Sequence, residues 1–296
     1  MSSEDQGESS VPVKPARRFD RRYLGLTVLF VAMELALTAA HAPKLLAWHY
    51  SAFGDAGANL TIEYLTQHGD RPGIDNGYIY GLLCLGFGHV WCGLVGLTPY
   101  ASFAAWALGN VLMGWGMARF AYHARVGPVG LALMLVEIVP GKDQTFVYIL
   151  EPVFLIHALA EQARGRREVA LALVTACAFV KPSLASVYGL VLLVTIFARR
   201  IEAGRGDFLR RLRDLLPATA VGVLLLVVLG THYGVPTLVR SLVPVHAAAI
   251  YRANRFGFFF GTGRGFWYFP GVMRNYYLGT PAGFWLAGSV VLVVGG

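Results

Sequence analysis

The sequence predicts an all-α membrane protein, a polytopic bundle of transmembrane helices. Hydrophobic residues make up 56% of the 296 residues, charged residues only 14%, and the mean hydropathy is +0.54. Several apolar runs reach or approach the roughly 20 residues that a helix needs to cross a bilayer. Because lipid cannot satisfy backbone amides and carbonyls, the spanning segments of such a chain must be helices.

Eight apolar segments are expected to span the membrane: residues 23–41, 100–121, 126–140, 145–162, 168–181, 183–198, 215–231 and 283–296. A further run, residues 78–97, is long enough to cross but is rich in glycine and carries His89 near its centre. If this run stays outside, the basic loops share one side with the basic N-terminal tail, and that side holds 16 of the 25 Lys and Arg residues. The positive-inside rule therefore favours eight spans with both ends cytosolic, and residues 78–97 as an outer juxtamembrane segment.

Two regions divide the chain. Residues 1–22 are polar and basic without a signal-peptide pattern, which predicts a disordered cytosolic tail. Residues 23–296 are predicted to form one transmembrane domain with long outer loops at 42–99 and 232–282. The final run, FWLAGSVVLVVGG, is short for a span, so we expect a chain truncated at its C-terminus. Richness in Ala, Gly, Arg and Val favours a bacterial inner membrane as its location.

Charge and cysteine content exclude two classes of site. The net charge of +8 comes from loops that are basic in most membrane proteins, so nucleic acid is not an expected partner. Cys84, Cys92 and Cys177 are scattered in apolar contexts without metal-ligand spacing, and they are expected to be buried.

The first outer loop carries the residues that point to a site. Asp55 stands in GDAG, and ANLTIEYLTQHG after it predicts a short amphipathic helix along the interface. Asp55 would then lie near the start of that helix, where an acid also serves as a cap. The following GDRPGIDNGYIYG is rich in turn signals and presents Asp75, Tyr78 and Tyr80, which equally suit a hydrated connection with interfacial tyrosines.

The order of these features resembles the GT-C-fold superfamily of integral membrane glycosyltransferases. The matching residues are Asp55, Ala58, Leu65, Gly69, Pro72, Asp75, Tyr78, Tyr80 and Gly81, followed by PGKDQ, RGRR and FVKPS. They cover about residues 24–200 and most resemble the hexosyltransferases and mannosyltransferases that use polyprenyl-phosphate sugars. The proline that often follows Tyr-Gly in that family is Leu82 here.

The resemblance implies inverting sugar transfer at the extracytoplasmic face. Asp55 would be the general base that accepts a proton from the acceptor hydroxyl, and Asp75 its partner or a ligand for a sugar hydroxyl. Tyr78 and Tyr80 would line the sugar site. The partners would be a lipid-linked sugar donor, a glycan, lipid or protein acceptor, and membrane lipids. A cofactor is not certain; a divalent Mg²⁺ or Mn²⁺ would suit an Asp-containing loop, although no cluster has defined ligand spacing.

A leaving lipid phosphate calls for cations, and the outer loop 232–282 contains basic residues but no acid. Arg255, Arg264 and His246 are therefore candidate substrate-binding residues, with Arg264 set among aromatics and glycines in FGFFFGTGRGFWYFPG. Lys181, at the end of an apolar helix, is a further candidate phosphate contact. The alternative is that these cations meet anionic lipid headgroups.

Two other functions stay open. Glu34, Glu137 and Glu151 lie within predicted spans, and intramembrane acids often carry function. Glu34 is a possible partner of Lys181, and Glu151 precedes Pro152 with His157 further along the same helix. These groups would suit a transporter or flippase of lipid-linked glycans, and a non-catalytic scaffold of the cell envelope is the third alternative.

Overall fold

The structure, a computed structural model, describes residues 20–47, 55–76, 78, 80–136, 146–198 and 212–243. Over these residues the chain forms helices and turns and no strand, so the all-α prediction is confirmed for the described part of the chain. The predicted last span, 283–296, and nearly all of the predicted tail, 1–22, lie outside it.

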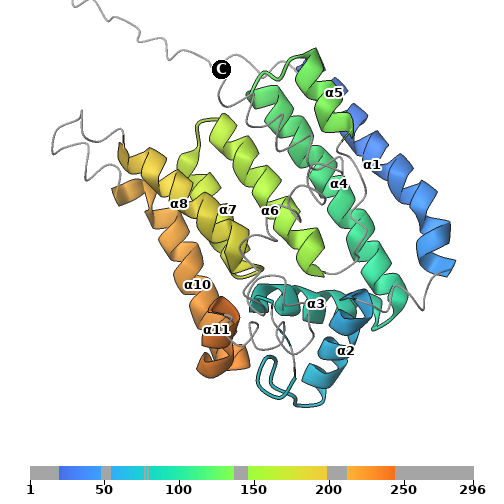
Figure 1. Cartoon of the computed structure of the whole chain (residues 1–296), viewed down its shortest axis with the longest axis vertical. Helices are drawn as coiled ribbons and strands as arrows, with labels where there is room; N and C mark the ends of the chain where they lie inside the picture. The colour runs from blue at the N-terminus through green and yellow to red at the C-terminus, as the bar shows by residue number, and fades with distance from the viewer. Residues whose placement is uncertain are drawn as a thin grey trace, which may run out of the picture.

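Six of the described helices pack side by side as the body of the molecule, and four others join or cover them (Figure 1). The body helices are α1 (Arg21–Ala47), α4 (Pro99–His123), α6 (Phe146–Ala163), α7 (Arg167–Ala178), α8 (Pro182–Ala198) and α10 (Leu216–Tyr233). The others are α2 (Asp55–Gln67), α3 (Leu82–Val95), α5 (Pro128–Val136) and α11 (Val235–Leu242). Several begin with proline, whose missing N–H and fixed φ suit the first helical turn.

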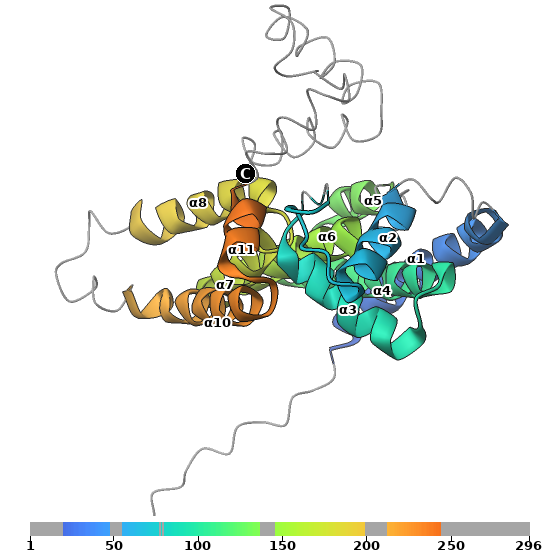
Figure 2. The same cartoon turned by 90° about the horizontal axis from the view of Figure 1, so that it is seen from below.

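The body helices form a row that follows the chain order (Figures 1 and 2). α4 lies between α1 and α6, α7 packs against α6, and α8 and α10 both contact α7. α1 and α4 approach closely because Gly114 has no side chain: a Cβ there would lie 3.0 Å from the backbone oxygen of Phe30. Small residues at such contacts are typical of membrane helices.

Two of the described helical segments are long and apolar enough to cross a membrane, Arg21–Ala40 and Leu212–Tyr233, and a third span results if the bent pair α3 and α4 is counted as one. Large apolar side chains such as Val28, Leu224 and Val227 are exposed on the first two segments, which suits contact with lipid. These features indicate a membrane protein.

The described helices begin and end close to the predicted segments. The largest shift is at the predicted first span, 23–41, because α1 continues to Ala47. The predicted segment 168–181 ends earlier than expected, at Ala178, because Pro182 biases the preceding residue away from helix. With 12 residues α7 is only about 18 Å long, which is shorter than the hydrocarbon core of a typical bilayer. Helix length thus does not by itself support all eight predicted spans.

α2, α3 and α11 lie across one end of the body helices, which we call the capped end (Figures 1 and 2). α3 is bent by 115° from α4. It is held there by a buried apolar cluster. The cluster consists of Tyr78, Leu82, Leu85, Phe179, Leu229 and Leu238.

Candidate functional site

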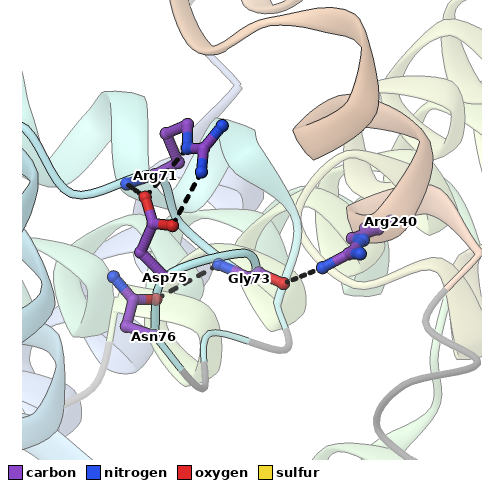
Figure 3. Close-up of polar contacts among 5 residues, drawn as sticks. All are labelled: Arg71, Gly73, Asp75, Asn76 and Arg240. Atoms are coloured by element: carbon purple, nitrogen blue, oxygen red, sulfur yellow. Dashed lines mark hydrogen bonds and ion pairs between the residues drawn. The ribbon is translucent and has the colours of Figure 1, made fainter.

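The turn between α2 and α3 is organised by Asp75. Its Oδ2 accepts hydrogen bonds from the Arg71 backbone N–H at 2.8 Å and from Arg71 Nε at 2.9 Å, and its Oδ1 accepts one from Arg71 Nη2 at 2.9 Å (Figure 3). The Arg71 side chain, donating to the carboxylate, lowers the pKa of Asp75 to about 2. Asp75 is therefore ionised at neutral pH and a weak base, which suits binding a hydroxyl better than removing its proton.

The same turn contacts α11, which lies at the beginning of the predicted outer loop 232–282. Asn76 Oδ1 accepts hydrogen bonds from the backbone N–H of Gly73 at 3.1 Å and of Tyr78 at 3.2 Å, which shapes the turn as an Asx motif. The carbonyl of Gly73 accepts a hydrogen bond from Arg240 Nη1 of α11 at 3.0 Å (Figure 3). One arginine of the predicted outer loop 232–282 thus meets the predicted outer loop 42–99 across 167 positions of sequence.

The two tyrosines differ in their surroundings. Tyr78 is buried, and its hydroxyl donates to the backbone oxygen of Gly81 at 2.9 Å. Burial raises the pKa of the Tyr78 hydroxyl well above its usual value, so it stays a neutral donor. Tyr80 is half-buried and meets the edge of the Tyr78 ring at 6.0 Å between centroids. Of the two, Tyr80 is the more accessible to a ligand.

Gly81 joins this loop to the turn between α7 and α8. Its backbone N–H donates to the oxygen of Val180 at 2.9 Å, and the N–H of Leu83 donates to the oxygen of Phe179 at 3.0 Å. A Cβ at position 81 would lie 1.9 Å from the Phe179 oxygen, so only glycine fits. The end of the Tyr80-Gly81 motif is therefore in direct backbone contact with the two residues that precede Lys181 in the FVKPS motif.

Lys181 follows this contact and is paired within the bundle. Its Nζ lies 3.1 Å from Oε2 of Glu151 on α6, whose side chain is almost fully buried. Glu151 Oε1 is buried and has no hydrogen-bond partner among the described residues. The pairing of Lys181 with Glu34 considered above is not observed: Glu34 is buried where α1 packs against α4 at Gly114.

The remaining predicted site residues are placed only in part. Asp55 is the first residue of α2, as the predicted amphipathic helix requires, but its side chain lies outside the described residues. His246, Arg255 and Arg264 also lie outside them. Within the described ranges, no three His, Cys, Asp or Glu side chains are grouped as metal ligands, so the expectation of Mg²⁺ or Mn²⁺ has no such group to support it there.

Two features of the capped end were not assigned from the sequence. Glu63 on α2 is buried and contacts His89 on α3, and Arg240, not one of the preferred late arginines, contacts the Gly73 turn. His89 did carry a signal, because it is the one basic side chain in an apolar helix that contains no acid, but no local pattern indicates its partner.

Comparison with known proteins adds no family: no family model, curated protein or solved structure matches the chain.

Proposed function

We propose that this protein is a membrane glycosyltransferase of the GT-C type. It would transfer a hexose from a polyprenyl-phosphate donor to an acceptor hydroxyl at the extracytoplasmic face. The proposal includes eight spans, a cytosolic N-terminus, a bacterial inner membrane, and the capped end as the extracytoplasmic side.

One observation carries the proposal: segments far apart in the sequence converge at the capped end. The loop that follows α2 meets the Lys181 turn through the paired backbones of Gly81 and Val180, and it meets α11 through the bond from Arg240 to Gly73. An anionic loop and two cation-bearing segments on one side of a bundle suit a donor with a lipid tail and a phosphate. The chemistry needs this proximity, since the acceptor and the phosphate must be held together.

In the proposed reaction the acceptor oxygen forms a bond to the anomeric carbon while the bond from that carbon to the phosphate oxygen breaks. Asp55 accepts the proton of the acceptor hydroxyl, and the lipid phosphate leaves with the bonding electrons. Lys181, with Arg255 and Arg264 from the late loop, would stabilise the charge that grows on the phosphate. A single displacement of this kind inverts the configuration of the sugar.

The decisive experiment is hexose transfer in membranes that contain the full chain. Polyprenyl phosphates that carry radiolabelled mannose or glucose are supplied, and labelled product is counted. Asp55→Asn removes the base and should lower the rate by about 10²–10⁴-fold. Asp70→Asn makes the same charge change in the same loop and should retain the rate. Equal rates for wild type and Asp55→Asn would overturn the proposed role of Asp55.

A transporter of lipid-linked glycans is the second candidate, and the Glu151–Lys181 pair favours it, since Glu151 is buried and Lys181 is only partly exposed. Buried ion pairs inside a bundle are costly and often belong to a transport pathway. Glu151→Gln would then stop translocation while Asp55→Asn leaves it unchanged; the enzyme shows the opposite sensitivity to Asp55→Asn. A cell-envelope scaffold would keep its complex in both variants.

A further inference from the structure

A second polar cluster at the capped end lies where α2, α3 and α10 meet, and the proposed sugar transfer does not use it. Its members are His89 of α3, His232 of α10 and Glu63 of α2. The two imidazole rings are 5.9 Å apart between centroids and inclined by 55°. Both histidines are exposed, whereas Glu63 is 1% exposed.

Glu63 determines which nitrogen of His89 is available. Its Oε1 lies 2.8 Å from His89 Nδ1, and the same oxygen accepts a hydrogen bond from Gln67 Nε2 at 2.8 Å. A carboxylate can only accept, so Nδ1 carries the proton and Nε2 carries the lone pair. The imidazole is thereby oriented with its lone-pair nitrogen on the edge opposite Glu63.

We propose that His89 and His232 bind a first-row transition-metal ion of the Zn²⁺ class, with Glu63 as the carboxylate that orients His89. Metal-ligating histidines almost always donate their other N–H to a carboxylate or carbonyl, and the Glu63–His89 contact has this form. With Zn–N bonds of about 2.0–2.1 Å, two imidazoles that share a metal have centroids roughly 5–6 Å apart. The observed 5.9 Å lies in that range.

The choice of metal follows from the ligands. Imidazole nitrogen suits Zn²⁺, Ni²⁺ and Cu²⁺, whereas Mg²⁺ and Mn²⁺ prefer oxygen. The described residues supply two ligands and not a closed set of three, so the remaining coordination positions are open to water or to an anionic oxygen ligand. The site is proposed independently of glycosyl transfer.

A purely structural role for the cluster explains less of what is seen. The Glu63 carboxylate already accepts from Gln67 Nε2 of its own helix, so a purely structural acid would not need His89 as a second donor to the same oxygen. Glu63 Oε2 is buried without a hydrogen-bond partner among the described residues, and neither role accounts for it. A structural role also gives no reason for His232, from a separate helix, to be exposed beside His89.

The test is a titration of the untagged, metal-free full chain in detergent with Zn²⁺ alone, followed by calorimetry. Wild type should bind one ion, and His232→Ala should weaken binding at least tenfold while leaving the protein folded, because His232 is exposed. Glu63→Gln should keep the stoichiometry and weaken binding about 10–100-fold.

Matched controls are His68→Ala, an exposed histidine of the turn that follows α2, and His123→Ala at the opposite end of α4. Both should bind Zn²⁺ as wild type does. Unchanged affinity in His232→Ala and in Glu63→Gln would overturn the proposal. Equal losses in His68→Ala would also overturn it, since they would indicate scattered surface binding. If His89→Ala fails to fold, the His232 and Glu63 variants still decide the question.

Discussion

Polar groups at the two opposite ends of the body helices differ in their burial and in their pairing. At the end opposite the cap, Arg119 of α4 is ion-paired with Glu161 of α6, and its Nη1 donates to His157 Nδ1 at 3.0 Å. His157 Nε2 in turn donates to the Leu112 oxygen at 3.1 Å, and the guanidinium lies 5.2 Å from the Trp115 ring. These groups are mostly buried and largely partnered by one another.

At the capped end several polar side chains face outward, although Glu63 and Glu151 are buried. Asp75, His89 and His232 are exposed, and Lys181 is partly exposed although it is paired. α2, α3 and α11 cover this end with backbone contacts and apolar packing and leave polar side chains accessible. The Arg119 network thus joins α4 to α6, whereas Asp75, His89 and His232 of the capped end remain accessible to a ligand.

The largest expected effect tests the structural role of the opposite end. Arg119→Met removes one partner of a buried ion pair and should lower the free energy of unfolding by about 3–5 kcal/mol. The double change Arg119→Met with Glu161→Leu replaces both partners by apolar groups and should recover most of the loss. Unfolding of the purified chain in mixed micelles measures both. A double variant as unstable as the single one would contradict the assignment.

A smaller effect is expected from Gly81→Ala at the capped end. The new Cβ would collide with the Phe179 oxygen and break the backbone contacts between α3 and the α7–α8 turn, at a cost of about 3 kcal/mol. Gly93→Ala on the same α3 helix meets nothing within 4 Å and should be neutral or slightly stabilising. Thermal unfolding followed by tryptophan fluorescence compares the two. Equal melting temperatures would mean that this docking is not required for the fold.

The smallest effect concerns the exposed Arg71–Asp75 pair. Because the pKa of Asp75 is lowered from 3.8 to about 2, the pair stabilises the turn above pH 4, and the contribution is lost as pH falls through about 2. The melting temperature of Asp75→Asn should therefore lie slightly below that of wild type at pH 5, and the difference should shrink as the pH falls from 4 to 2. Asp70→Asn is the control, and a difference that stays constant between pH 5 and pH 2 would exclude the ion pair as its cause.

Sequence patterns were most reliable where the signal is local. The helix at Asp55 and the ends of α4, α6 and α8 were predicted closely, because apolar runs, prolines and glycines act within a few residues. The partners of charged groups were not predicted in the same way. Glu151 for Lys181, His89 for Glu63 and Gly73 for Arg240 are joined across 26 to 167 positions, and no local pattern encodes such pairings.

By itself the sequence determined that this chain is helical and suited to a membrane. This follows from the overall composition and from the lengths of the apolar runs, which favour lipid over water whichever residues come into contact. Only the tertiary structure decided which charges neutralise one another and which face outward at the capped end. Which charges are paired and which are exposed depends on how helices that are far apart in the sequence pack together. Examples are the close contact of Gly81 with the Phe179 oxygen and the contact of Glu63 with His89.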